Sequence, residues 1–241
     1  MAHDPVCLMS LDPKQATAMA THAGKAYYFC SETCRHKFVA SPEVYLKKSP
    51  AMQLTVGVMG SASDEQSEEI IAAVFKLGKI IARKNFILIT GACPGLPYEC
   101  ARGVKKADGM SIGISPALSL DEHVHRYNSP VDVYDVIIYT GSGLMGREVT
   151  NIRSSDMVVV VGGSSGTLGE FAIAYDEGKL IGVLEGSGGI TEQLPQLVES
   201  INKDTGAELV YNADPSLLME ELGRAYSTRH FHHPSCFCEE P

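Results

Sequence analysis

The chain has 241 residues, of which 44% are hydrophobic and 20% are charged. This composition is typical of globular proteins, and the length suits one α/β domain with a short additional module. A formal net charge of −9 without any Lys/Arg block argues against binding to duplex nucleic acid. No apolar run reaches the ~20 residues that cross a bilayer, and residues 1–15 lack a signal-peptide pattern. We therefore expect a cytoplasmic protein without nucleic-acid or membrane partners.

The character of the sequence changes along the chain and predicts four parts. Residues 1–46 are short, polar and aromatic and hold three of the 7 cysteines, which predicts a small separate module. Residues 47–52 carry two lysines followed by Ser-Pro, a pattern typical of a linker. Residues 53–226 alternate apolar runs with amphipathic stretches and form the main domain. Residues 227–241 have no apolar period and are expected to be an irregular tail rich in His and Cys.

Three cysteines of the first part, Cys7, Cys30 and Cys34, have C-x22-C-x3-C spacing. The short spacing predicts that Cys30 and Cys34 share a face of one helix, with Cys7 contributed by a preceding turn. Three thiolates arranged in this way suit a soft or borderline metal such as Zn(II) or Cu(I). The alternative is that the three side chains are buried and inert among the neighbouring aromatic residues.

The sequence around these cysteines resembles the YHS domain, a relative of TRASH metal-binding modules. The resemblance rests on residues 4–7, 22–31, 34, 37–38 and 41–46. Such domains occur in copper-transporting ATPases and other metal-handling proteins, so the resemblance implies a metal site. Structural zinc usually takes four ligands, and the nearby candidates for the fourth position are His3, His22 and His36. His36 lies two residues from Cys34, which is an awkward spacing on one helix, and His22, which belongs to the family pattern, is either a ligand or a residue that only packs. Because so small a module has little core, a bound metal would also stabilise its fold.

From residue 53 onward, β-rich runs alternate with stretches of helical period. The predicted strands cover residues 54–59, 86–90, 110–114, 133–139, 157–161, 180–184 and 209–211. The predicted helices cover residues 64–83 and 98–107, one stretch between the fourth and fifth strands, and residues 166–177, 194–201 and 215–226. This alternation predicts the α/β class, with a doubly wound, mostly parallel, Rossmann-like sheet covered on both faces.

Glycine-rich turns follow three of these strands, and parallel strands end on one rim of a sheet, where ligands bind. Backbone N–H groups, hydroxyls and a helix N-terminus in such turns suit a phosphate, although a plain strand-to-helix turn is the alternative. The predicted phosphate-binding residues are Gly60, Ser61, Gly91, Gly162, Gly163, Ser164, Ser165, Gly166 and Thr167. No Lys follows the glycines as in a Walker loop, and the dinucleotide fingerprint is absent after the first strand. No dinucleotide cofactor is therefore expected.

Residues 162–170 are similar to the GGxGTxxE motif of the Lonely Guy (LOG) family. Upstream, residues 143–147 end in Arg147, and residues 153–156 lead into the next predicted strand. This arrangement matches the family's Arg-bearing helix, in which the arginine lies nine residues before the aspartate that opens the strand. The resemblance covers residues 53–226 and is closest to the branch that includes molybdenum-cofactor-carrier-like proteins. It implies a Rossmann-like fold and a homo-oligomer, either a dimer or a tetramer. LOG enzymes cleave the N-glycosidic bond of nucleoside 5′-monophosphates and release the base and ribose 5-phosphate.

The same resemblance places Arg147 and Glu170 at the catalytic arginine and glutamate of the family. Breaking an N-glycosidic bond builds oxocarbenium character, which a carboxylate such as Glu170 can stabilise while it holds a ribose hydroxyl or orients water. Arg147 can pair with the phosphate or with Glu170, or steady the leaving base. We expect a nucleoside monophosphate phosphoribohydrolase. The alternatives are a non-catalytic carrier of a nucleotide or of the molybdenum cofactor, and a metal-handling protein whose α/β domain serves oligomerisation.

Two other features of the second part have two interpretations each. The polar segment at residues 121–128 is either a lid in which His123 or His125 contacts the ligand, or an exposed connector. Cys93, in the turn after the second strand, is either a reactive thiol at a helix start or a small packing residue.

The tail holds a second set of potential metal ligands within nine residues: His230, His232, His233, Cys236 and Cys238. These side chains form a second metal site, complete the first one, or belong to an irregular end that contacts nothing. The sequence leaves these three possibilities open.

Overall fold

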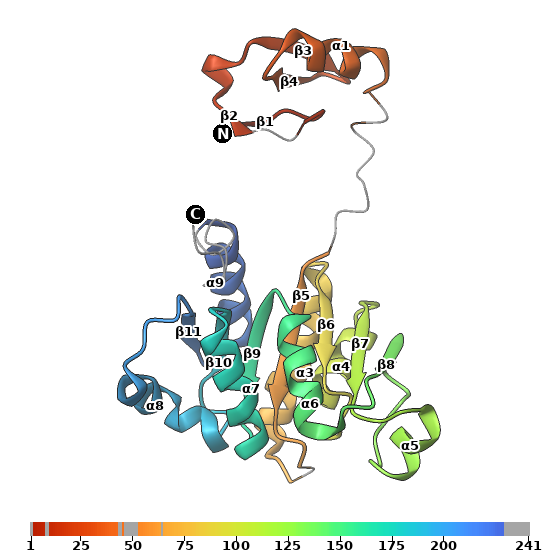
Figure 1. Ribbon diagram of the computed structural model, residues 1–241, viewed down its shortest axis with the longest axis vertical. Coiled ribbons are helices and arrows are strands. Elements are labelled where there is room, and N and C mark those ends of the chain that lie inside the picture. The colour runs from red at the N-terminus through yellow and green to blue at the C-terminus, as the bar shows by residue number, and fades with distance from the viewer. Residues whose placement is uncertain (1, 8–9, 43–44, 46–52, 64, 229–241) are drawn as a thin grey trace. The chain divides into compact units, whose positions relative to one another are not determined.

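Figure 1 shows a computed structural model of the chain. The structure describes residues 2–7, 10–42, 45, 53–63 and 65–228. The predicted linker at residues 47–52 lies outside this range, as do the potential ligands of the tail. The chain divides into two compact units, Met1–Met52 and Gln53–Pro241.

The first unit is a small α+β module. Its elements are β1 (Ala2–His3), β2 (Ser10–Leu11), η1 (Pro13–Gln15), β3 (Ala18–His22), β4 (Lys25–Phe29) and α1 (Glu32–Ala40). β3 and β4 form an antiparallel hairpin, and β1 pairs antiparallel with β2. Among the described residues of this unit, the buried apolar side chains are Ala18, Phe29 and Phe38. With so few, the apolar core can supply only a small part of the stability that a larger domain obtains from burial.

The second unit contains a seven-stranded sheet in which all neighbouring strands are parallel. Its strands are β5 (Thr55–Gly60), β6 (Ile87–Thr90), β7 (Ser111–Ser115), β8 (Val136–Tyr139), β9 (Met157–Val161), β10 (Leu180–Leu184) and β11 (Glu208–Asn212). The strand order is β11-β10-β9-β5-β6-β7-β8. The chain therefore winds outward from β5 in one direction, returns to the other side of β5 at β9, and winds outward again. This confirms the predicted doubly wound α/β fold.

Helices connect the strands and cover both faces of the sheet (Figure 1). They are α3 (Glu68–Arg83), α4 (Leu96–Lys106), α5 (Leu120–His125), α6 (Gly143–Arg153), α7 (Ser165–Asp176), η2 (Gly189–Gln193), α8 (Leu194–Ile201) and α9 (Pro215–Thr228). Glycines allow the close packing of α3 on α4, because a Cβ on Gly78 would collide with the carbonyl group of Cys100.

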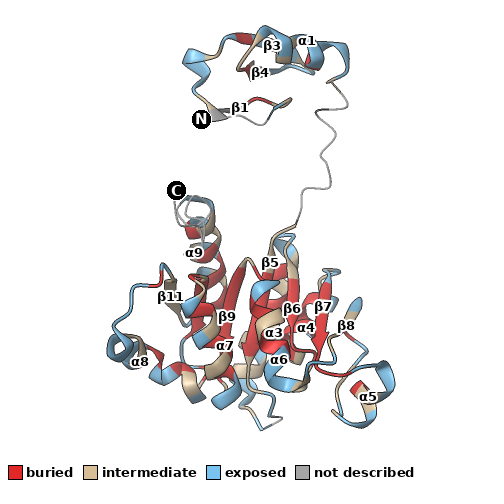
Figure 2. Cartoon of the chain, viewed as in Figure 1, coloured by how far each residue is buried: buried red, intermediate tan, exposed pale blue. Residues whose placement is uncertain are grey.

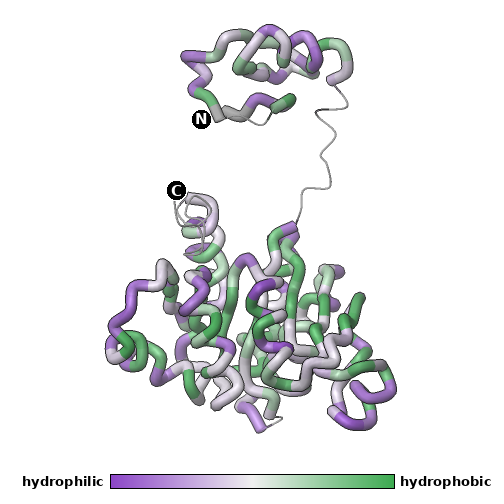
Figure 3. The backbone as a smooth tube through the Cα atoms, in the orientation of Figure 1, coloured by the Kyte–Doolittle hydropathy of each residue, from purple (hydrophilic) through white to green (hydrophobic). Residues whose placement is uncertain are grey.

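The core lies in two layers, one on each face of the sheet. Along β9, Met157, Val159 and Val161 belong to the layer under α3, α4 and α9. The alternate residues Val158 and Val160 belong to the layer under α7 and α8. This alternation follows from the two-residue period of a strand, and burial on both faces explains why β9 is apolar throughout. Figures 2 and 3 show the resulting buried, hydrophobic centre of the sheet.

The structure differs from the predicted elements mainly at their ends. α3 begins at Glu68 and not at residue 64, because the Ser67 side chain caps it by accepting a hydrogen bond of 3.3 Å from the N–H of Ile70. β8 begins at Val136 and not at residue 133. Among the residues described, no helix combines the length and apolar character that a membrane crossing requires.

Candidate functional site

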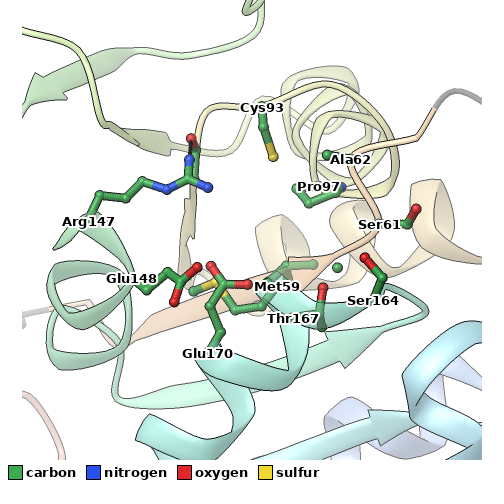
Figure 4. Close-up of a pocket in the computed structure, with 14 residues that line it drawn as sticks. Met59, Ser61, Ala62, Cys93, Pro97, Arg147, Glu148, Ser164, Thr167 and Glu170 are labelled. Atoms are coloured by element: carbon green, nitrogen blue, oxygen red, sulfur yellow. Dashed lines mark hydrogen bonds between the residues drawn. The ribbon is translucent and has the colours of Figure 1, made fainter. Parts of the chain in front are cut away.

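A pocket of the α/β unit opens at the carboxyl ends of β5, β6 and β9 (Figure 4). β5 lies between β6 and β9, so this is the point where the winding direction of the sheet reverses. Open α/β sheets bind ligands at such switch points. The pocket encloses about 500 Å³, including space open to solvent. Six of the predicted phosphate-binding residues line it: Gly60, Ser61, Gly91, Ser164, Gly166 and Thr167.

The other three predicted residues, Gly162, Gly163 and Ser165, are not among those that line the pocket. The N–H of Gly162 donates a hydrogen bond of 2.8 Å to Oγ of Ser187, and the carbonyl of Gly163 accepts one of 2.9 Å from Ile190. Both glycines have positive φ values, of 59° and 94°. They therefore shape the turn that leads from β9 into α7.

The first turn of α7 is available to an anion. The helix begins at Ser165 and has no side-chain cap on its N-terminal backbone groups. Its first N–H groups have no partner within the helix, and they point along the positive end of the helix dipole. Ser164 and Thr167 add hydroxyl groups on the side that lines the pocket. This combination resembles the helix N-termini at which many proteins bind phosphate.

Arg147 reaches the pocket from α6 and is 8% exposed. Its Nη1 donates a hydrogen bond to the carbonyl oxygen of Gly91. A Cβ at residue 91 would collide with the guanidinium group, which explains the glycine after β6. The Nε of Arg147 is buried and has no hydrogen-bond partner among the described residues. The guanidinium group therefore retains donors for a ligand.

Glu170 reaches the same pocket from the second turn of α7 and is 7% exposed. Its Oε1 accepts a hydrogen bond of 3.3 Å from Nδ2 of Asn151. Burial raises the pKa of Glu170 to about 7, although Arg147 and Asn151 both favour its ionised form. A carboxyl group with a pKa near neutrality can both accept and donate a proton during one reaction cycle. The structure thus brings together the two side chains that the sequence selected.

Two side chains of this site were missed by the sequence reasoning, namely Glu148 and Asn151. Glu148 is 5% exposed and lines the pocket, and burial raises the pKa of its carboxyl group while Arg147 opposes the rise. Asn151 is fully buried beside Glu170. Asn151 lies four residues after Arg147, and helix periodicity places such residues on the same face. That spacing was a usable signal.

Three sulfur atoms of the N-terminal unit lie close together, as the cysteine spacing predicted. Sγ of Cys30 is 3.5 Å from Sγ of Cys7 and 3.8 Å from Sγ of Cys34. Thiolates bound to one metal at ~2.3 Å are separated by about 3.8 Å, so the donor set fits a metal ion. The predicted shared helical face is wrong, because Cys30 precedes the cap residue Ser31 and lies outside α1. Cys30 lies in the bend between the end of β4 and the start of α1.

Asp4 joins the three cysteines in a four-residue cluster of potential ligands. One carboxylate oxygen accepts a hydrogen bond of 2.8 Å from the N–H of Val6, and the other accepts one of 2.8 Å from the N–H of Cys30. Asp4 therefore ties the two cysteine-bearing segments together. Hydrogen bonds with the neighbouring Asp4 and Cys7 raise the pKa of Cys30 to about 12. The cysteines of the cluster can therefore all be deprotonated only when a cation lies among their sulfur atoms.

The comparison with known families decides the class of the α/β unit. The sequence model of the SLOG cluster4 family matches residues 53–219. The chain belongs to this family. The YHS domain matches residues 2–49. The predicted combination of a YHS domain with a LOG-like and carrier-like Rossmann domain is thereby confirmed.

Similar proteins are known for each part. A copper-transporting P-type ATPase of Rhizobium leguminosarum bv. viciae is 48% identical over 46 residues, which are 19% of this chain and 6% of the ATPase. The molybdenum cofactor binding protein of Rippkaea orientalis is 27% identical with a TM-score of 0.61, over 74% of this chain and 99% of that protein. The molybdenum cofactor carrier protein of Chlamydomonas reinhardtii is 26% identical with a TM-score of 0.59, over 73% and 99% of the two chains.

His123 and His125 of the SLOG domain do not line the described pocket. His123 is fully buried, with Nδ1 2.8 Å from Oγ of Ser115 and Nε2 3.2 Å from the carbonyl oxygen of Pro130. His125 is exposed on α5. Cys93 does line the pocket, and burial raises the pKa of its thiol while Arg147 opposes the rise. A neutral thiol is a weak nucleophile, which favours the packing interpretation of Cys93.

His22 of the YHS domain is not part of the described cluster of metal ligands. It ends β3, and its ring lies edge-on to the ring of Phe38 with centroids 6.2 Å apart. The interpretation in which His22 packs in the small core therefore agrees with its surroundings. The potential tail ligands lie outside the described residues, and their role stays a prediction.

Proposed function

We propose that the SLOG domain hydrolyses the N-glycosidic bond of nucleoside 5′-monophosphates and releases the base and ribose 5-phosphate. The observation that carries this proposal is the meeting of Arg147 and Glu170 in one pocket beside the uncapped start of α7. A phosphate site and an acid–base carboxyl group within one pocket suit the two ends of a sugar phosphate. The neutral-range pKa of Glu170 supports the assignment.

In this reaction, the electron pair of the C1′–N bond leaves with the base, which takes up a proton. A water molecule bonds to C1′ and transfers one proton to Glu170, which passes this proton to the departing base and so regains its ionised form. The ionised carboxylate also stabilises the positive charge that develops on the ribose in the transition state. Arg147 provides the guanidinium group that balances the negative charge of Glu170 and of the phosphate. The first turn of α7 holds the phosphate and thereby positions C1′.

The second candidate is a non-catalytic carrier. It is favoured by the similarity to molybdenum cofactor binding and carrier proteins, which extends over almost the whole length of those proteins. The pterin of the molybdenum cofactor carries a phosphate, so the same helix start serves both candidates. Incubation with a panel of nucleoside monophosphates, scored for free base by chromatography, separates them. Base release supports the hydrolase, whereas binding of a nucleotide without release supports the carrier.

The YHS domain holds one soft metal ion, Zn(II) or Cu(I), between Cys7, Cys30 and Cys34. The sulfur–sulfur distances support this assignment, and the likeness to the copper-transporting ATPase supports Cu(I). Thiolate ligation is also the preference of Cu(I). Metal analysis with and without residues 229–241 tests whether the tail takes part. Loss of metal on truncation alone would move the site to the tail.

The SLOG domain assembles with a second copy of itself through the edge of its sheet, as a dimer or a tetramer. On β8, Val136 and Ile138 are 43% and 46% exposed on the same side of the strand. Leu144 and Met145, at the start of α6, are 56% and 71% exposed. Exposed apolar side chains on and near an edge strand suit an interface with a second copy. Ile138→Glu should lower the mass measured by light scattering to that of the monomer, and an unchanged mass would argue against this interface.

A further inference from the structure

A second carboxylate of the pocket has no role in the reaction described above. Glu148 is 5% exposed, and its carboxylate points into the pocket beside that of Glu170 (Figure 4). It makes no hydrogen bond with any residue that the structure describes. Its two oxygens remain accessible from the pocket, so they can accept hydrogen bonds from a ligand that enters it.

The carboxylate of Glu148 lies against the first turn of α7. A Cβ on Gly166 would be 3.8 Å from its Oε1, and a Cβ on Gly169 would be 3.0 Å from its Oε2. Gly169 therefore leaves the space that the carboxylate uses. The proposed phosphate site is formed by the N–H groups of the same turn. Glu148 would therefore contact the part of a phosphorylated ligand that lies only a few bonds from the phosphate.

The chemistry of a carboxylate decides which groups these are. An ionised carboxylate accepts hydrogen bonds at both oxygens and donates none. In a sugar phosphate, the donors within a few bonds of the phosphate are the sugar hydroxyls, and a cis-diol offers two of them side by side. Acidic side chains read ribose hydroxyls in this way in dinucleotide-binding folds.

We propose that the carboxylate of Glu148 accepts hydrogen bonds from the 2- and 3-hydroxyls of the ligand's ribose and so selects ribose over 2-deoxyribose. This inference rests on the sugar phosphate ligand of the proposed function. It adds a residue that determines specificity, and it leaves the acid–base role to Glu170.

The test is calorimetric titration of the full chain with ribose 5-phosphate and with 2-deoxyribose 5-phosphate, in the presence of EDTA. Neither probe has an N-glycosidic bond, so the result does not depend on hydrolysis. We expect the wild-type protein to bind the deoxy compound about 10- to 100-fold more weakly, because the missing hydroxyl leaves a buried acceptor unpaired. Glu148→Gln should remove most of this preference by weakening the binding of ribose 5-phosphate. Glu220→Gln, at an exposed position of α9, is the matched control and should keep the preference.

A second variant protects the test against a folding defect of Glu148→Gln. Gly169→Ala places a methyl group 3.0 Å from Oε2 and should reduce the preference by displacing the carboxylate. Equal binding of the two probes by the wild-type protein would overturn the inference, as would no binding of either. A preference that survives in both variants, or one that requires Mg²⁺, would also overturn it. A clear preference in a protein that releases no base would instead refute the hydrolase and leave this inference standing.

Discussion

Replacing Glu170 by Gln should stabilise the protein at alkaline pH, although it removes the carboxyl group to which we assign the acid–base role. The carboxyl group is 7% exposed, and its burial raises its pKa to about 7 from the ordinary value of 4.5. Ionisation is therefore less favourable in the folded chain than in the unfolded one. The introduced glutamine would keep the shape of the side chain and an oxygen that can accept the hydrogen bond from Asn151.

The sign and size of this effect follow from linkage between proton binding and folding. Between pH 4.5 and about 7 the folded state binds the Glu170 proton more tightly than the unfolded state, so stability falls as the pH rises and is constant above this window. At about 1.4 kcal/mol per pKa unit, the full cost of ionisation is about 3 kcal/mol. Glu170→Gln removes this cost. Its gain in the free energy of unfolding should thus approach about 3 kcal/mol at pH 8 and be small at pH 5.

Urea unfolding at pH 5 and pH 8, followed by far-ultraviolet circular dichroism, measures the gain directly. Glu220→Gln serves as the control, because Glu220 is 61% exposed on α9 and should behave alike at both pH values. A gain for Glu170→Gln that is the same at pH 5 and pH 8 would refute the reasoning. It would mean that Glu170 ionises as easily in the folded chain as in water.

Three further outcomes are expected. Arg147→Ala and Glu170→Gln should each lower base release about 10²- to 10³-fold with unchanged circular dichroism, and near-normal release by either would remove that residue from the mechanism. Gly166→Val should abolish calorimetric binding of ribose 5-phosphate with the fold retained, because beyond its own helix an added Cβ meets only a carboxylate oxygen of Glu148 at 3.8 Å; undiminished binding would place the phosphate elsewhere. The double variant Cys30→Ser, Cys34→Ser should lose the roughly one soft metal ion per chain found by elemental analysis in the wild type, and full retention would exclude the N-terminal site.

The regular part of the fold was accessible from the sequence because its pattern is strong and local. The run Met157–Val161 predicts a strand buried on both faces, and β9 has these same bounds. α5 was missed because its six residues are too few to show a helical period. It forms because Ser119 caps it, with Oγ accepting a hydrogen bond of 3.3 Å from the N–H of Glu122.

The site was accessible only where a motif names its residues. Arg147 and Glu170 were found from the family pattern, and the fold brings them into one pocket. Glu148 was not found, because its significance arises from burial against the first turn of α7, a segment 18 residues away in the chain. The position of Cys30 was misjudged for a related reason. The spacing of Cys30 and Cys34 equals one helical turn, but Ser31 starts the helix between them.

Catalysis of base release from a nucleoside 5′-monophosphate by Arg147 and Glu170 can be measured directly. The assay follows the loss of each monophosphate together with the appearance of free base and ribose 5-phosphate. We expect at least one monophosphate to yield the two products in equal amounts with the wild-type protein, whereas Arg147→Ala and Glu170→Gln yield neither at a comparable rate. A wild-type protein that binds a monophosphate and returns it intact would contradict this mechanism and identify the SLOG domain as a carrier.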